Sequence, residues 1–237
     1  VRNADDPLVM ALSAPEKPTP YYFSLRGQAP NTWYADDSAV LFGERQVARR
    51  ADNPLPGEHN MANVLAAMAM MHAGGFDLDA VVGALRAFPG VEHRIERVMS
   101  LDGVDYYNDS KSTNVDSLRV ALESFTRPIV LIAGGRGKGS DYRILCPLIA
   151  ERVKQLIVFG EDAPQLEIAY GDCVPVERAD SMMDAVRRAQ RAAAPGDVAL
   201  LSPACASFDM YDNFEARGRD FKDCLQRLTD DTRDRPS

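Results

Sequence analysis

Three loops of this sequence carry lysines and hydroxyl groups in settings that suit an anionic ligand. The first, 108–114 (NDSKSTN), places Asp109, Lys111 and Thr113 between a predicted strand and the start of a predicted helix. Unpaired backbone N–H groups at a helix start attract anions, and a nearby ammonium strengthens that attraction. Thr113 with Asp116 three residues later resembles a capping box, with Asp in place of Glu or Gln. An ordinary N-cap beside a surface lysine explains the same residues and stays open here.

The second loop, 134–141 (GGRGKGSD), is rich in glycine and follows an apolar run. It matches neither phosphate-binding template, because the G-x-G-x-x-G spacing is absent and Lys138 precedes Gly139 where a Walker loop has Ser or Thr. The remaining interpretation is a flexible backbone that presents Lys138, together with Arg136, to an anion such as a carboxylate. The alternative is a glycine turn with solvated cations.

The third loop lies within 200–214 (LLSPACASFDMYDNF), where an apolar run gives way to small residues. Small side chains let a ligand approach the backbone and leave a hydroxyl such as that of Ser207 free to meet it. A tight turn between a strand and a helix, with small residues chosen for packing, is the alternative.

Two further groups of residues could meet a nucleotide. Asn60 and Asn63 lie one helical turn apart, so both amides can face one ligand such as a purine edge. Arg94 suits bidentate phosphate binding, although a structural ion pair is the commoner role of a lone arginine. The three histidines are scattered, so no metal site is predicted from them.

The elements that must position these loops alternate regularly in the second part of the chain. Strands are predicted at 104–108, 128–134, 155–160, 174–178 and 198–202, and helices at 114–125, 141–153, near 162–169, 180–193 and 213–228. Alternating strands and helices with apolar strands favour an α/β fold, a Rossmann-like parallel sheet covered on both faces. Ligands of such sheets bind at the carboxyl ends of the strands, and all three loops belong to that edge.

The first part of the chain has another pattern. Residues 1–52 read as short strands and turns, and a helix is predicted in GEHNMANVLAAMAMMHAGG, followed by a second helix at 77–88 that Asp77 caps. Pro89-Gly90 ends this helix. The sequence therefore predicts two domains, 1–91 and 92–237.

Composition narrows the function classes. The net charge of −8 without a basic cluster argues against nucleic acid and anionic membranes as partners. The apolar runs are too short to span a bilayer, and no signal peptide is seen. The four cysteines are scattered and are interpreted as reduced thiols of a cytoplasmic protein.

Five stretches together resemble the Mur ligase family, and in particular its D-glutamate-adding members. They are GEHNMANVLAA, FPGVEHRIERV, YYNDSKSTNVDS, LIAGGRGKGSDY and LLSPACASFDMYDNFEARG, in the order that the family shows. The resemblance implies the tail of a central P-loop-type ATPase domain followed by a Rossmann-like amino-acid-binding domain. It implies an ATP-dependent, Mg²⁺-requiring ligase of peptidoglycan synthesis that couples D-glutamate to UDP-N-acetylmuramoyl-L-alanine through an acyl phosphate, acting as a monomer.

The resemblance also implies a role for each candidate residue. Asn63 would meet the adenine with Asn60 nearby, and Arg94 and Asp109 would approach the phosphates and ribose. The two carboxylates of D-glutamate would be held by Lys111, Thr113, Lys138, Ser207 and the backbone at Phe214, with Lys111 and Lys138 acting in catalysis.

Two departures qualify the resemblance. Arg136 stands where some members have an acidic residue, so its role stays open. No Gly-Lys-Ser/Thr phosphate loop occurs in the chain, and that loop and the metal ligands are expected upstream of Val1, so the chain alone is expected to be inactive. The alternatives are a folylpolyglutamate-type ligase, a nicotinamide-dependent oxidoreductase and a non-catalytic D-glutamate-binding module.

Overall fold

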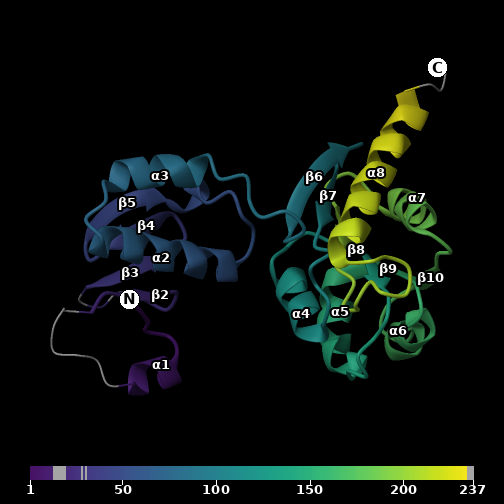
Figure 1. Ribbon diagram of the computed structural model, residues 1–237, viewed down its shortest axis with the longest axis horizontal. Helices are drawn as coiled ribbons and strands as arrows, with labels where there is room; N and C mark the ends of the chain where they lie inside the picture. The colour runs from purple at the N-terminus through teal and green to yellow at the C-terminus, as the bar shows by residue number, and fades with distance from the viewer. Residues whose placement is uncertain (13–19, 28, 30, 234–237) are drawn as a thin grey trace. The chain divides into compact units, whose positions relative to one another are not determined.

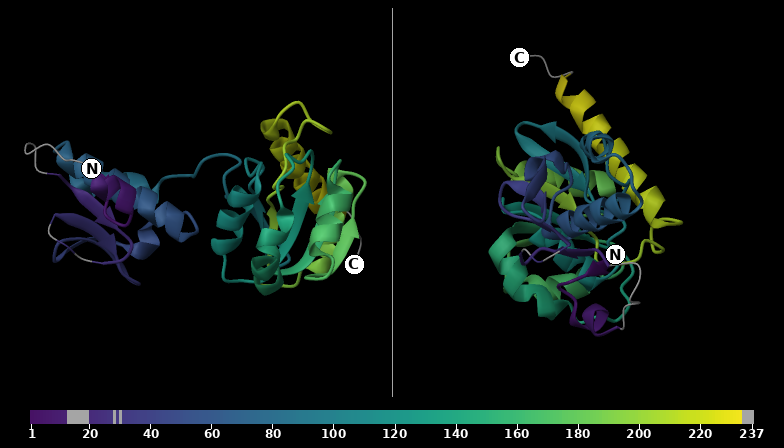
Figure 2. Two further views of the ribbon diagram at one scale, coloured as in Figure 1. Left: turned by 90° about the horizontal axis from the view of Figure 1, so that it is seen from below. Right: turned by 90° about the vertical axis from the view of Figure 1, so that its left-hand side faces the viewer.

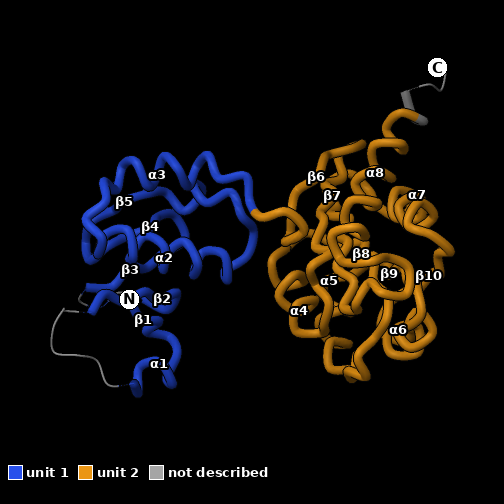
Figure 3. The backbone as a smooth tube through the Cα atoms, in the orientation of Figure 1, with its two compact units in different colours: residues 1–90 blue, residues 91–237 orange. Residues whose placement is uncertain are grey.

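The computed structural model describes residues 1–12, 20–27, 29 and 31–233. It separates into two compact units, Val1–Gly90 (unit 1) and Val91–Ser237 (unit 2) (Figure 3). The domain boundary predicted from the sequence falls one residue beyond this division. Each unit has a hydrophobic core of its own.

Unit 1 is built on a mixed sheet, in which five strands follow the order β1-β2-β3-β4-β5 within the described residues. The strands are β1 (Arg2–Asn3), β2 (Tyr22–Ser24), β3 (Thr32–Ala35), β4 (Ala39–Phe42) and β5 (Arg45–Arg49). The first three run parallel, and the last two pair antiparallel. Its helical segments are α1 (Pro7–Ala11), η1 (Arg50–Asp52), α2 (Glu58–Ala73) and α3 (Leu78–Arg86).

Helices α2 and α3 pack their apolar sides into the core of unit 1, which centres on Trp33. The buried positions Met61, Val64, Leu65 and Met68 of α2 recur at helical spacing, as the sequence predicted. Asp77 caps α3 and accepts a hydrogen bond from the Asp79 N–H at 3.2 Å, which confirms the predicted N-cap.

Unit 2 contains a sheet in the order β10-β9-β8-β11-β7-β6 (Figure 1). The strands are β6 (Glu96–Leu101), β7 (Val104–Asn108), β8 (Ile129–Gly134), β9 (Val153–Phe159), β10 (Val176–Arg178) and β11 (Val198–Leu201). The helical segments are α4 (Val115–Glu123), η2 (Tyr142–Leu145), α5 (Cys146–Arg152), α6 (Ala163–Tyr170), α7 (Met182–Ala192) and α8 (Phe214–Arg233). All neighbouring strands run parallel except β6 and β7, so the predicted α/β class is confirmed.

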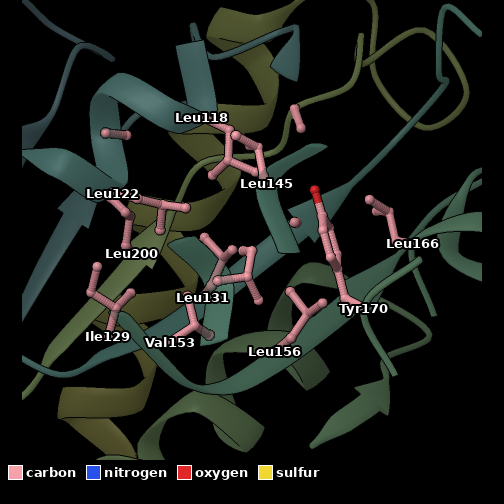
Figure 4. Packing of buried hydrophobic residues seen from close by; sticks show 14 of the residues in the cluster. Leu118, Leu122, Ile129, Leu131, Leu145, Val153, Leu156, Leu166, Tyr170 and Leu200 are labelled. Atoms are coloured by element: carbon pink, nitrogen blue, oxygen red, sulfur yellow. The ribbon is translucent and has the colours of Figure 1, made fainter. Parts of the chain in front are cut away.

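Helices cover both faces of the unit 2 sheet (Figures 1 and 2). On one face Leu118 of α4 and Leu166 of α6 join a cluster with Leu131 and Leu200 (Figure 4). Ile149 of α5 belongs to the same cluster. On the other face Val186 of α7 and Phe221 of α8 join a cluster with the alternate strand residues Val130 and Leu201. Because side chains alternate along a strand, central strands buried on both faces require the near-continuous apolar runs seen in the sequence.

Two details of unit 2 differ from the prediction. The first strand predicted after Gly90 was 104–108, but Glu96–Leu101 already forms β6, an antiparallel edge strand. The cap of α4 is Asn114, whose side chain accepts a hydrogen bond from the Ser117 N–H at 2.8 Å, so the capping box proposed for Thr113 is wrong by one residue.

The expectation of four reduced thiols is also wrong. Cys146 and Cys173 form a disulfide with their Cα atoms 6.1 Å apart, whereas Cys205 and Cys224 are free and buried. The pair is separated by 27 positions, and it meets because the fold brings the start of α5 beside the segment after α6. The spacing of the cysteines in the sequence does not indicate that these two lie close together in the fold. None of the described helices combines the length and the apolar character needed to cross a lipid bilayer.

Candidate functional site at the carboxyl ends of the central strands

The three loops singled out from the sequence leave neighbouring strands at the same edge of the sheet. In the sheet of unit 2, β11 lies between β8 and β7 and runs parallel to both. Leu201, the last residue of β11, pairs with Asn108 at the end of β7 and with Ile132 near the end of β8. The loops bearing Lys111, Lys138 and Ser207 therefore start from one edge.

Backbone hydrogen bonds tie these loops to one another. The Asp109 N–H donates to the Leu201 carbonyl at 2.8 Å, and the Gly134 N–H donates to the Pro203 carbonyl at 2.9 Å. Arg136 and Ala206 exchange two backbone bonds, at 2.8 and 2.9 Å. The glycine-rich loop and the small-residue loop thus form one connected backbone surface.

Gly135 shows why this surface needs glycine. A Cβ atom there would lie 2.2 Å from the Ala206 carbonyl oxygen, and the backbone has φ of +127°, which side chains rarely adopt. Gly135 therefore allows two main chains to pack closely.

Lys111 lies over the ring of Phe214. Its Nζ is 3.9 Å from the ring centroid, a cation–π distance, while the side chain as a whole stays exposed. The Lys111 N–H donates to the His93 carbonyl at 3.1 Å, and the neighbouring Ser110 hydroxyl donates to the Phe214 carbonyl at 2.8 Å. Two residues predicted to share a site are thus in direct contact, and Thr113 is half-buried two positions further on.

Asp109, at the start of the first loop, has a buried carboxyl group. It accepts hydrogen bonds from the Ser202 hydroxyl at 2.9 Å and the Ile95 N–H at 3.2 Å. Burial raises its pKa to about 7, and these hydrogen bonds and the charge of Arg94 only partly oppose that rise. The group therefore changes charge near neutral pH, which a sequence cannot reveal.

The glycine-rich loop presents one cation to solvent and holds another in an ion pair. Lys138 is exposed, and no ion pair or hydrogen bond to it occurs in the part of the chain that the structure describes. Arg136 Nε donates to Glu161 at 2.8 Å. The role of Arg136 that the sequence left open is therefore, in this structure, an ion pair on its side chain and a bridge to Ala206 on its backbone.

Ser207 is nearly covered, with 2 % of its surface exposed. Its carbonyl accepts hydrogen bonds from the Met210 and Tyr211 N–H groups, at 3.1 and 2.8 Å, which fixes the turn that follows. The next side chain, Phe208, is exposed. The predicted hydroxyl thus lies just below the rim of the edge.

The remaining predicted residues lie elsewhere. Asn60 and Asn63 are in the first turns of α2 in unit 1, where the Asn60 amide donates to the Pro56 carbonyl at 2.7 Å and Asn63 is exposed. Arg94 is exposed near the start of unit 2, next to the buried His93.

Beside Arg94, three side chains of the kinds that bind metal ions lie close together, and a lysine already pairs with two of them. Single ligand atoms of Glu92, His93 and Glu96 lie within 4.8 Å of one another. Lys222 Nζ donates to Glu92 at 2.6 Å and to Glu96 at 3.1 Å, so the ammonium balances both carboxylates. The group fits an ion-pair cluster and not a metal centre.

Sequence reasoning missed two buried residues at this edge, Arg217 and Ser110. The side chain of Arg217 lies at the ends of β7, β8 and β11 and donates to Ser110 Oγ at 3.0 Å. An arginine in an amphipathic helix normally faces water, so its burial shows only in the fold.

Comparison with known proteins identifies the family of this chain. Residues 93–205 match the family described as "Mur ligase, glutamate ligase domain". The chain is 46% identical, over 97% of its length and 52% of the relative, to a UDP-N-acetylmuramoylalanine–D-glutamate ligase of Symbiobacterium thermophilum. It is 50% identical, over 81% of its length and 41% of the relative, to the enzyme of the same name from Salinibacter ruber. The chain spans about half the length of the curated relatives it matches.

Solved structures share the fold at low sequence identity. A pseudomurein peptide ligase type C from Methanothermus fervidus superposes with a TM-score of 0.68 at 12% identity, covering 96% of this chain and 56% of that one. A UDP-N-acetylmuramate-alanine ligase from Thermotoga maritima gives a TM-score of 0.62 at 15% identity, covering 88% and 48%. At these identities the solved structures show only a shared fold. The family match over residues 93–205 and the relatives at 46% and 50% identity show that the chain belongs to the Mur ligase family.

Proposed function

We propose that this chain supplies the amino-acid-binding part of a cytoplasmic, ATP-dependent ligase that joins D-glutamate to UDP-N-acetylmuramoyl-L-alanine in peptidoglycan synthesis. The observation that carries the proposal is the common edge of β7, β8 and β11, where connected loops bear the exposed Lys111 and Lys138. The names of relatives aligned over nearly the whole chain support the same substrates.

The chemistry of D-glutamate suits this edge. The amino acid carries two carboxylates at neutral pH, and ammonium and hydroxyl groups are their natural partners. In the proposal, Lys111 and Lys138 neutralise the carboxylates, while Thr113 and Ser207 donate hydroxyl hydrogen bonds and the backbone at Phe214 completes the site. A lysine held over an aromatic ring keeps its ammonium in place before the substrate arrives.

The proposed reaction has two steps. The carboxylate of UDP-N-acetylmuramoyl-L-alanine attacks the γ-phosphorus of ATP, which forms an acyl phosphate and releases ADP. The amine of D-glutamate then attacks the acyl carbon, the amine loses a proton, and phosphate leaves as the amide bond forms. Both steps place negative charge on oxygen, which Lys111 and Lys138 would stabilise at the acyl end.

Nucleotide contacts belong to the same proposal. Asn63, with Asn60 nearby, would hydrogen-bond the adenine, and Arg94 and Asp109 would approach the phosphates and ribose. Arg94 is exposed and has a guanidinium suited to phosphate oxygens. Mg²⁺ would accompany ATP and neutralise its phosphates. The one ligand-type cluster found among the described residues is balanced by Lys222, so no residue of this chain is assigned to the ion.

Calorimetry and turnover of the full-length protein encoded by the gene test the proposal. D-glutamate is expected to bind and to be coupled, whereas L-glutamate and lysine are not. Lys111→Ala should lower kcat/KM for D-glutamate by about 30- to 1,000-fold, because a charge-assisted partner worth roughly 2–4 kcal/mol is lost.

Lys154→Ala is the matched control. Lys154 lies near the amino-terminal end of β9, at the opposite edge, and pairs with Asp197 at 2.8 Å. This variant should keep the kinetics of the parent within about twofold, since Lys154 lies at the edge opposite the proposed site. Near-normal turnover of Lys111→Ala would refute its role, and coupling of L-glutamate in preference to D-glutamate would point to a folylpolyglutamate-type ligase.

A further inference from the structure

Arg217 is a fully buried arginine whose hydrogen-bond acceptors are all uncharged. Its exposed fraction is 0 %. Nε donates to Ser110 Oγ at 3.0 Å, and Nη2 donates to the Ser110 carbonyl at 2.9 Å. Nη1 donates to the Cys205 carbonyl at 3.1 Å and to the Gly134 carbonyl at 3.3 Å. Among the described residues, Arg217 has these hydrogen bonds but no ion pair, whereas a fully buried arginine is usually paired with a carboxylate.

These acceptors come from three different strand ends. Ser110 follows β7, Gly134 is the last residue of β8, and Cys205 follows β11. The Ser110 hydroxyl extends this hydrogen-bond network to α8, because it accepts a hydrogen bond from Arg217 and donates one to the Phe214 carbonyl at the start of that helix. One guanidinium thus joins the roots of the loops that carry Lys111, Lys138 and Ser207, as well as the helix end that carries Phe214.

Only an arginine can make this set of contacts. A guanidinium is planar and offers five N–H donors in a fixed fork, whereas an ammonium is a single point on a flexible stem. Burial lowers the pKa of Arg217 only to about 10, so the group keeps its charge at neutral pH. Burying an unbalanced charge is costly, and four hydrogen-bond acceptors around it offset that cost.

We infer that Arg217 is a positioning residue for the amino acid substrate. It holds the three loops at the spacing at which the two lysines and the Ser207 hydroxyl can meet both carboxylates of D-glutamate together. This inference rests on the proposed function, because it presumes that D-glutamate binds at this edge. Arg217 itself has no exposed surface and touches no substrate.

Substitution in the full-length protein tests the inference. Arg217→Lys keeps the charge and removes the fork, so KM for D-glutamate should rise at least tenfold while KM for ATP stays within twofold. Arg152→Lys is the matched control, because Arg152 is half-buried and donates to the Phe125 carbonyl at 3.3 Å just before β9 begins, at the opposite edge. That variant should leave both KM values unchanged.

A role in folding alone gives another result. It would lower the yield of active protein, and hence the apparent kcat, with both KM values unchanged. This outcome for Arg217→Lys would overturn the inference. If Arg217→Lys does not fold, Ser110→Ala tests the inference instead, since it removes one hydrogen-bond acceptor of Arg217 and the hydrogen bond to Phe214. It should raise KM for D-glutamate about three- to tenfold, and an unchanged KM would overturn the inference.

Hydrogen exchange separates this inference from the proposed function. In Arg217→Lys the amides of Asp109, Gly134 and Arg136 should exchange at least tenfold faster than in the parent, while those of β9 do not change. If exchange is faster in the variant but the parent protein fails to bind D-glutamate, Arg217 still holds the loops together and the proposed function is refuted. If the parent binds D-glutamate while the exchange rates and the KM of the variant are unchanged, only the positioning role of Arg217 is refuted.

Discussion

At the scale of single residues, burial gives Asp109 a pKa near neutral pH. Its carboxyl is buried, and its pKa is raised to about 7 from the ordinary value of 3.8. In the unfolded chain the carboxyl loses its proton near pH 4, but the folded chain keeps that proton until about pH 7. The stability that this group contributes is therefore full below pH 4 and is lost as the pH rises to about 7.

Asp109→Asn should remove this dependence, because an amide resembles the protonated acid. Relative to the parent, the free energy of unfolding of the variant should rise by about 2–4 kcal/mol between pH 4 and pH 8. Urea denaturation at the two pH values measures the difference. Asp172→Asn, at an exposed position, is the control and should show the same difference from the parent at both pH values. A constant difference for Asp109→Asn as well would contradict the prediction.

The residues differ in how far the sequence reveals them. Lys111, Lys138 and Ser207 follow predicted strands in unusual loops, so local sequence sufficed to place them at one edge. Arg217 gave no such signal, because its acceptors at Ser110 and Gly134 are 107 and 83 positions away in the chain. Only the folded chain brings such distant groups together.

At the scale of elements, helix α8 passes very close to the segment that begins unit 2. A Cβ atom on Gly218 would lie 2.2 Å from His93 Nδ1. His93 cannot give way easily, because it is buried and contacts the Asn108 amide at 2.9 Å. Gly218, in the second turn of this helix, is therefore required for packing.

Gly218→Ala should lower the free energy of unfolding of unit 2 by about 1–3 kcal/mol, the usual cost of overpacking. Gly83→Ala is the matched control, since Gly83 also lies inside a helix, α3, and has no atom within 4 Å of an added Cβ. That variant should gain about 0.5–1 kcal/mol from helix propensity. Denaturation followed by circular dichroism, with the fluorescence of the single tryptophan Trp33 reporting on unit 1, measures both. Equal effects of the two substitutions would contradict this account.

Periodicity predicted the parallel strands well, since β8 and β11 are buried at every position and read as apolar runs. It missed β6, in which Glu96, Arg97 and Ser100 are polar and much of the strand is half-exposed. An edge strand has only one neighbour and one well-covered face, so its pattern resembles that of a charged loop. The N-cap of α4 was misplaced because Thr113 and Asn114 are both good caps, and backbone geometry alone decides between them.

At the scale of the whole molecule, two units with separate cores carry different parts of the proposed chemistry. Unit 1 contains Asn60 and Asn63, and unit 2 contains the strand edge with its lysines. The 237-residue sequence contains no Gly-Lys-Ser/Thr phosphate loop, although the proposed reaction transfers a phosphoryl group.

The 237-residue chain by itself is therefore expected to give no D-glutamate-dependent phosphate release, since its sequence lacks that phosphate loop. The full-length protein encoded by the gene should release phosphate in the presence of both substrates. A coupled phosphate assay of the two proteins at equal concentration makes the comparison. Substrate-dependent release by the 237-residue chain would show that the phosphate site lies within it.

The link between Arg136 and Ala206 consists of main-chain atoms only. Arg136 is exposed, so any exchange there that keeps the N–H, and so any except proline, leaves that link available. Randomised libraries at Arg136 can therefore alter the charge beside the proposed substrate site while the loop framework persists. Directed evolution toward acceptance of other acidic amino acids has a natural starting point there.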